Sequence, residues 1–174
     1  MIDGNYYIDK SYLIEVIKDT NVSQLIKGLQ EGNEEQVEII LNDILSKSIS
    51  YYDNYETFYH GFLVGLFQEN KVKSNKESAD GRFDVVIYRQ TRFKSTILIE
   101  CKYSKGYETM KKDSEEVIQQ MKIKNYQAEL VEQGINKIQM YGIKRIKELV
   151  ENTSSFIYVK QKWWNTFILW NKMI

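Results

Sequence analysis

The chain has 174 residues, of which 43% are hydrophobic and 13% aromatic, and this length and composition suit a single globular domain with a sizeable core. Its 24 basic and 24 acidic residues give no net charge, which excludes a global positive field and leaves only a local basic patch to attract a polyanion. The single cysteine, Cys101, excludes a disulfide framework and a cysteine-based zinc cluster and fits a reducing cytoplasm.

The N-terminal part, about residues 1–50, is predicted to be a helical extension. Its first residues, MIDGNYYIDK, lack the basic and apolar segments of a signal peptide, and no apolar stretch of the chain is long enough to span a bilayer, so we expect a cytoplasmic protein. Helical spacing occurs at about 10–19, 22–31 and 34–47.

A further helix is predicted over about 54–68, and it is followed by a first strand at about 71–75. Glu56 and His60 are one turn apart in this helix and therefore share a face. His60 is the only histidine of the chain. We interpret it as a packed or hydrogen-bonded structural residue rather than as a general base.

The segments RFDVVIYRQ and STILIECKY have the composition of β-strands and are joined by a polar turn at about 90–94, which predicts an antiparallel hairpin. The side-chain period of two puts Glu100 and Lys102 on one face of the second strand. It puts Cys101 on the opposite face, so we interpret this cysteine as a small core residue.

After the hairpin, residues from about 107 to 133 are predicted to form one long helix or two consecutive helices, closed by Gly134. A short strand is predicted at about 137–142. The aromatic segment SFIYVKQKWWNTFILWNKMI is compatible with a strand followed by either a helix or a second strand.

Asp84 lies at the start of the first hairpin strand, where a hairpin brings it within reach of Glu100. Two convergent carboxylates are hard oxygen ligands that suit Mg²⁺ or Mn²⁺, and such an ion can activate water and neutralise charge on a phosphate. Lys102, beside them, is suited to stabilising negative charge in the transition state.

These residues stand within a longer pattern. From YHGFLVGLF through KSNKESADGRFDVVI and TILIECKY to IQQMKIKNYQAEL and YGIK, about residues 25–143, the sequence resembles the bacterial PD-(D/E)XK nuclease domain that often follows an AAA-type ATPase-like domain. The resemblance implies an α/β fold with a restriction-endonuclease-like core, in which helices flank a four-stranded mixed central sheet. It also implies hydrolysis of phosphodiester bonds, most typically in DNA, with a divalent cation.

The resemblance also implies roles for particular residues. Asp84 and Glu100 match the metal-binding acids and Lys102 the catalytic lysine. Further matches are Gln120 as a catalytic residue, Glu56 and Glu77 as additional metal ligands, and Ser78 and Tyr126 as substrate contacts. Lys73 and Arg82 belong to a local group of cations suited to binding phosphates; its other members are Lys71, Lys76, Lys102, Lys105, Lys111 and Lys112.

We expect residues 1–174 to form a single domain with a nuclease core at about 51–143 and a divergent tail at about 144–174. Three hypotheses follow for its function. The first is a Mg²⁺-dependent nuclease, and the second is a catalytically silent module that binds nucleic acid or an ATPase-like partner. In the third, the aromatic tail mediates formation of a homodimer.

Overall fold

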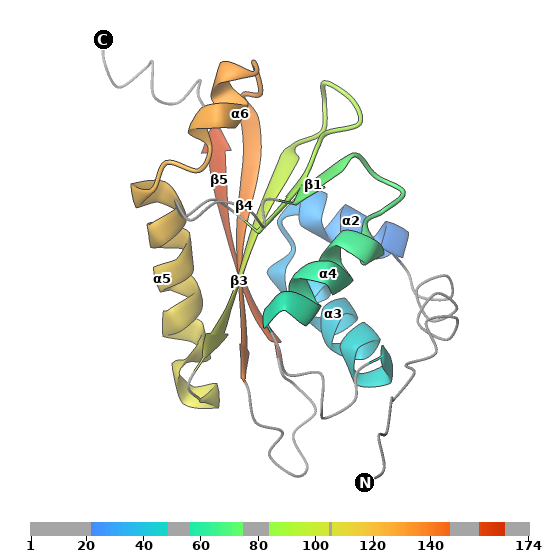
Figure 1. The fold of residues 1–174 in the computed structure, drawn as a ribbon, viewed down its shortest axis with the longest axis vertical. Coiled ribbons are helices and arrows are strands. Elements are labelled where there is room, and N and C mark those ends of the chain that lie inside the picture. The colour runs from blue at the N-terminus through green and yellow to red at the C-terminus, as the bar shows by residue number, and fades with distance from the viewer. Residues whose placement is uncertain (1–21, 49–55, 75–83, 105, 147–156, 166–174) are drawn as a thin grey trace, which may run out of the picture.

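The structure, a computed structural model, describes residues 22–48, 56–74, 84–104, 106–146 and 157–165. Its centre is a mixed sheet of five strands in the order β1-β2-β3-β4-β5 (Figure 1). In the first three strands, β1 (Val72–Ser74), β2 (Val85–Ile87) and β3 (Thr96–Ser104), each strand is antiparallel to its neighbour. Strand β4 (Lys137–Ile146) runs parallel to β3, and β5 (Ile157–Asn165) pairs with β4 in the antiparallel sense.

Helices cover both faces of the sheet. Figure 1 shows α2 (Val22–Glu31), α3 (Glu34–Ser48) and α4 (Glu56–Leu66) on one side. Helix α5 (Met110–Ile123) lies on the other side, preceded by the short 3₁₀ helix η1 (Tyr107–Thr109) and followed by α6 (Ala128–Glu132). The fold is therefore α/β with a mixed central sheet flanked by helices, as the sequence predicts.

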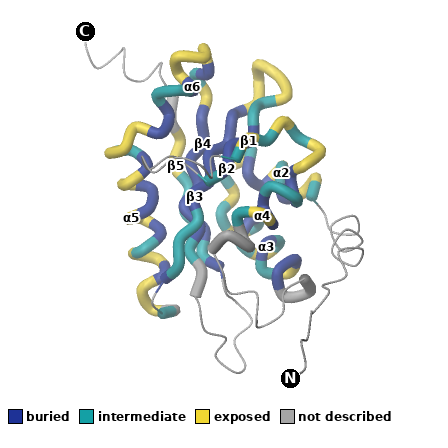
Figure 2. Tube along the Cα trace, in the orientation of Figure 1, coloured by how far each residue is buried: buried dark blue, intermediate teal, exposed yellow. Residues whose placement is uncertain are grey.

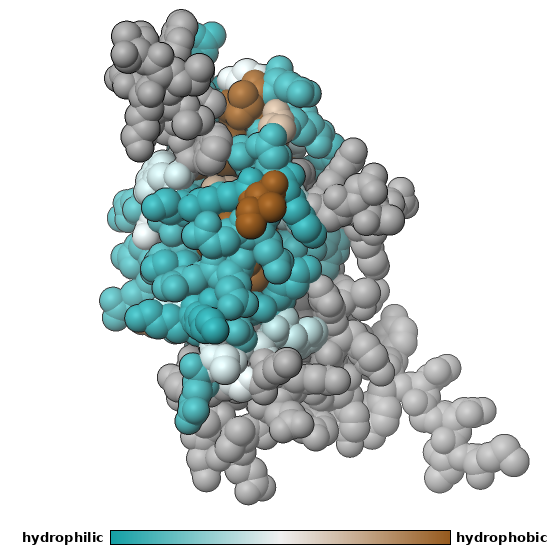
Figure 3. Space-filling view, turned by 90° about the vertical axis from the view of Figure 1, so that its left-hand side faces the viewer, coloured by the Kyte–Doolittle hydropathy of each residue, from teal (hydrophilic) through white to brown (hydrophobic). Residues whose placement is uncertain are grey.

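The sheet separates two apolar cores because its strands alternate their side chains between the faces. Ile97 and Ile99 of β3 pack with the buried residues of α2, α3 and α4, whereas Leu98 packs with α5 and α6. In Figure 2 the central strands are buried along most of their length. The outer face on the α5 side is mainly hydrophilic, with only isolated apolar side chains (Figure 3). Cys101 packs against the core on the α2–α4 side, which confirms its interpretation as a core residue.

Several predicted elements agree with the structure, and others differ in extent. The helices expected at 22–31 and 34–47 are α2 and α3, whereas the segment at 10–19 lies outside the described residues. The helical region after the hairpin is divided, because Asn125 adopts a left-handed conformation with φ 53° that ends the α5 path. The strand expected at 137–142 continues to Ile146 along the whole of β3.

The expectation of a four-stranded sheet is wrong, because β5 adds a fifth strand at the edge. The sequence left the secondary structure of the aromatic segment partly open, and the structure shows that its residues 157–165 form this strand. A parallel β3–β4 pair leaves the outer edge of β4 open, and β5 satisfies its backbone hydrogen-bonding groups. The chain beyond residue 165 lies outside the described residues.

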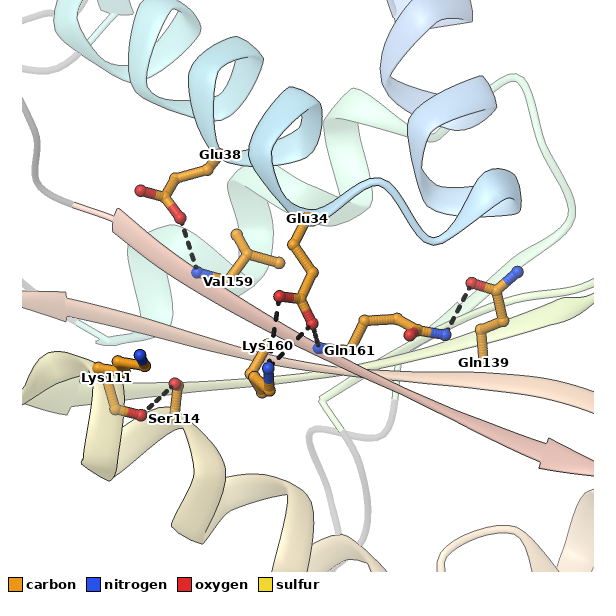
Figure 4. Close-up of polar contacts among 8 residues, drawn as sticks. All are labelled: Glu34, Glu38, Lys111, Ser114, Gln139, Val159, Lys160 and Gln161. Carbon is orange, nitrogen blue, oxygen red and sulfur yellow. Dashed lines mark hydrogen bonds and ion pairs between the residues drawn. The ribbon is translucent and has the colours of Figure 1, made fainter.

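The outer edge of β5 is in turn satisfied by polar side chains of α3 (Figure 4). Glu34 accepts a hydrogen bond from the backbone N–H of Gln161 (2.8 Å), and Glu38 accepts one from Val159 (3.4 Å). Asn42 accepts a hydrogen bond from the N–H of Ile157 (3.1 Å). The three acceptors are four residues apart along α3, and the three N–H donors are two residues apart along β5. Both spacings correspond to roughly 6–7 Å, so each side chain meets one N–H group. This contact covers an edge that would otherwise pair with another chain.

Within the described ranges, no helix is both long enough and apolar enough to cross a lipid bilayer.

Candidate active site

Asp84 and Glu100 occupy adjacent positions on neighbouring strands. Val85 pairs with Ile99 in the antiparallel β2–β3 register, so the next pair along the two strands is Asp84 and Glu100. Residues directly opposite each other in an antiparallel pair point to the same face. That face is the α5 side, because Val86 and Leu98, two residues away on each strand, belong to the core under α5. The hairpin therefore brings the two predicted acids together.

Asp84 is held by contacts on both its side chain and its backbone. Its Oδ2 accepts a hydrogen bond from the backbone N–H of Cys101 at 2.7 Å, which fixes the carboxylate against β3. Its carbonyl oxygen lies 2.9 Å from Nε2 of His60. The same nitrogen lies 2.7 Å from Oγ of Ser74. His60 thus ties α4 to β1 and to the backbone at Asp84, which confirms its interpretation as a hydrogen-bonded structural residue.

Glu100 is a buried carboxylate that is only partly compensated. The residue is 4% exposed, and its Oε1 forms an ion pair with Nζ of Lys102 at 3.0 Å. Its Oε2 is buried and has no hydrogen-bond partner among the residues that the structure describes. Burial and the negative charge of Asp84 raise the pKa of Glu100 from 4.5 to about 6, although Lys102 and Lys124 oppose this rise.

This arrangement fits a divalent cation. A buried carboxylate oxygen without a hydrogen bond is costly, and a hard cation beside it removes that cost by supplying the missing positive partner. Asp84 faces the same space and provides a second oxygen ligand. The described residues contain no cluster of three or more His, Cys, Asp or Glu side chains that could hold a metal ion. Mg²⁺ commonly keeps several waters and binds substrate phosphates, so such oxygens would share the coordination with these carboxylates.

Two residues from the end of α5 approach the same site. Tyr126 is 7% exposed, and burial, followed by the charge of Glu100, raises the pKa of its hydroxyl to about 12. Nζ of Lys124 lies 5.9 Å from the centre of the Tyr126 ring, and its charge acts on Glu100. Sequence reasoning proposed Tyr126 but missed Lys124. The sequence held only a weak signal for Lys124, which was its position two residues before Tyr126.

The other predicted site residues have more varied positions. Lys73 of β1 forms an ion pair with Glu129 of α6 at 3.1 Å, and both side chains are partly exposed. Gln120 is exposed on α5, one helical turn before Lys124. Glu56 is the first residue of α4, but its side chain lies outside the described structure. The remaining three predicted residues, Glu77, Ser78 and Arg82, also lie outside it.

Gly142 sets the distance between α5 and the strand beside the site. It pairs with Glu100 in the β3–β4 register, and a Cβ atom built on it would lie 2.9 Å from the carbonyl oxygen of Ser114 in α5. We expect Gly142→Ala to destabilise the fold by roughly 1–3 kcal/mol, because backbone must move to relieve the overlap. Chemical denaturation measures this change.

Gly65 of α4 is the matched control, because a Cβ atom on it would meet nothing within 4 Å. We expect Gly65→Ala to be neutral or stabilising by up to about 1 kcal/mol, since alanine favours a helix over glycine. Equal stability of the Gly142→Ala variant and the native protein would show that α5 does not depend on this close contact.

Comparison with known families agrees with the geometry of this site. A model of the PD-(D/E)XK nuclease superfamily matches residues 54–152, which is more than half of the chain. The chain belongs to the PD-(D/E)XK nuclease superfamily. No curated protein matches it. The match begins just before α4 and includes every strand from β1 to β4, so this PD-(D/E)XK core contains both acids and the lysine of the Glu-x-Lys motif.

Proposed function

We propose that this PD-(D/E)XK protein is a nuclease that hydrolyses phosphodiester bonds in DNA with Mg²⁺ or Mn²⁺. The observation that carries the proposal is the pair of Asp84 and Glu100 on one face, with Oε2 of Glu100 buried and lacking a hydrogen bond. Superfamily membership supports the same reaction class. We further propose that the chain acts as a single cytoplasmic domain.

Asp84 and Glu100 would hold the cation between them. When bound, a divalent cation lowers the pKa of water towards neutrality and neutralises charge on a phosphate under attack. The hydrogen bond from the N–H of Cys101 fixes the carboxylate of Asp84 before substrate arrives, so little reorganisation is needed on binding. Glu56 and Glu77 remain proposed as additional ligands.

Lys102 would stabilise negative charge on the phosphate. Its side chain is 37% exposed, so the ammonium reaches both Glu100 and solvent. Lys124 would add a second positive charge on the α5 side. Tyr126 remains protonated at neutral pH, because its pKa is raised to about 12, and its hydroxyl can therefore donate a hydrogen bond to a phosphate or a water molecule. We retain Gln120 as a supporting catalytic residue, and Lys73, Ser78 and Arg82 as phosphate contacts.

A cleavage assay tests this proposal. The purified chain is incubated with single-stranded, duplex and branched DNA and with RNA, in Mg²⁺, Mn²⁺ or EDTA. We expect cleavage of at least one DNA substrate with either cation and none in EDTA. Asp84→Asn should abolish cleavage, whereas Asp43→Asn on the exposed surface of α3 should not.

The assay also separates the proposal from its main alternative. Tight binding of nucleic acid that stays intact in Mg²⁺ and Mn²⁺ would identify a catalytically silent binding module. In that case a direct titration with Mn²⁺ shows whether the pair of acids still binds a cation.

A further inference from the structure

The turn between β2 and β3 exposes an aromatic ring between two cations. Phe93 is 89% exposed, the highest value among the exposed large hydrophobic residues of the described chain. Its neighbours Arg92 and Lys94 are also exposed. Placing an aromatic ring in water is unfavourable, and neither core of the domain receives this side chain. A ligand that stacks on an aromatic face would use it.

The hairpin is strongly basic although the chain as a whole is neutral. Residues 85–99 contain Arg89, Arg92 and Lys94 and no acidic residue. A further cation comes from the segment before β1, where Nζ of Lys71 lies 5.0 Å from the centre of the Tyr88 ring. Glu69, two residues before Lys71, is also exposed, but the four cations outnumber this acid. Cations next to an exposed ring are typical of surfaces that bind nucleic-acid strands.

The tip and the active site lie on the same pair of strands. Asp84 and Glu100 lie at one end of the β2–β3 pairing, and the tip joins the two strands at the other end. Lys94 is six positions before Glu100, which corresponds to roughly 20 Å of extended chain. A nucleic-acid strand of several nucleotides can cover this distance. The tip projects from the end of the sheet (Figure 1) and is therefore accessible to such a strand.

Edge strand β1 runs beside β2, along the path from the active site to the tip of the hairpin. Lys73 is level with Val86 in the β1–β2 register and thus points to the same face as Asp84. Lys71, two residues earlier, follows at a spacing of about 6.6–6.8 Å along the strand. Cations at this spacing can follow a phosphate backbone from the site towards the tip.

We propose that the tip of the β2–β3 hairpin is a second nucleic-acid-binding site, where an unpaired base stacks on Phe93 while Arg92, Lys94 and Lys71 bind the neighbouring phosphates. The inference rests on the proposed nuclease function and deepens it, because it names a strand with unpaired bases as the preferred substrate. Bases within an intact duplex are stacked on one another and do not offer a free face to Phe93.

Equilibrium binding tests this proposal without any cleavage. Fluorescence anisotropy of a labelled single-stranded DNA of about 20 nucleotides is measured with the full chain in EDTA, and a duplex of equal length is measured in parallel. We expect Phe93→Ala to raise the Kd for the single strand on the order of tenfold and to change that for the duplex less than about twofold. Ile39→Ala is the matched control, because Ile39 is also exposed (61%) but lies on α3.

A spectroscopic measurement distinguishes stacking from electrostatic attraction. In Phe93→Trp, single-stranded DNA should quench the additional indole emission, since a stacked base contacts the ring directly. Replacing both Arg92 and Lys94 by alanine should reduce the slope of log Kd against log salt concentration by about 1–1.5.

Three results would overturn the proposal. They are an unchanged Kd of Phe93→Ala for the single strand, an equal loss for single strand and duplex, and unquenched emission of Phe93→Trp. Because turnover is not measured, an inactive protein can still meet these expectations. Failure of the cleavage assay is therefore distinguishable from failure at the hairpin tip.

Discussion

Replacing Glu100 by glutamine is expected to abolish cation-dependent cleavage and at the same time to stabilise the cation-free protein. The activity falls because glutamine removes the charge of one metal ligand, and metal ions contribute several kcal/mol of transition-state stabilisation. A loss on the order of 10³-fold in rate is therefore expected. Stability rises because the native carboxylate is buried, has one oxygen without a hydrogen bond and faces Asp84. Glutamine retains the shape of the side chain without the charge.

The pKa of Glu100 sets the size and pH range of this stabilisation. The difference between 4.5 and about 6 corresponds to about 2 kcal/mol of unfavourable free energy for the charged form in the folded protein. Between these two pH values the folded state retains a proton that the unfolded state has lost. The stability of the native cation-free protein therefore falls as pH rises through this window. The advantage of Glu100→Gln should develop from about pH 4.5 and be complete near pH 7.

Urea unfolding in EDTA across pH 4–8 measures this difference. Glu116→Gln is the matched control, because Glu116 is 61% exposed on α5 and its only described ion pair is a 3.9 Å contact with Lys112. We expect this control to change stability by less than about 0.5 kcal/mol. A Glu100→Gln variant that is less stable than the native protein at pH 7.5 would contradict the assignment of Glu100 as a buried charge that is only partly compensated.

Replacing Lys102 by methionine is expected to lower the cleavage rate by on the order of 10²–10³-fold while cation binding persists. Methionine keeps much of the apolar stem but removes the charge that would stabilise the phosphate, and loss of one such group has an effect of this size. The ammonium also lowers the pKa of Glu100 from 3.0 Å away. Its removal should therefore raise that pKa further and shift the rise in Mn²⁺ affinity to higher pH.

Rates and Mn²⁺ titrations measured between pH 6 and 8.5 test both effects. Lys27→Met is a suitable control, because Lys27 is 68% exposed and lies on α2, on the opposite side of the sheet from α5. This control should retain the native rate and pH profile. A Lys102→Met variant that cleaves within about threefold of the native rate would remove Lys102 from the proposed mechanism.

The local pattern of the sequence was sufficient to predict the hairpin and its acids. Strand periodicity and the polar turn together place Asp84 opposite Glu100 and direct Cys101 to the other face, because side-chain direction in a strand depends only on position. The helices α2 and α3 were predictable for the same reason, since one apolar stripe must face the core. The family resemblance supplied the reaction class and added Tyr126.

Only the tertiary structure determined what surrounds the acids. The action of the Lys124 charge on Glu100 and the close approach of α5 to Gly142 join segments that are distant in the sequence. The lack of a hydrogen bond to Oε2 of Glu100 likewise depends on which side chains pack around it. The contact of α3 with the edge of the fifth strand also joins residues more than 100 positions apart. Such contacts arise from the packing of whole elements, and no local periodicity encodes which elements become neighbours.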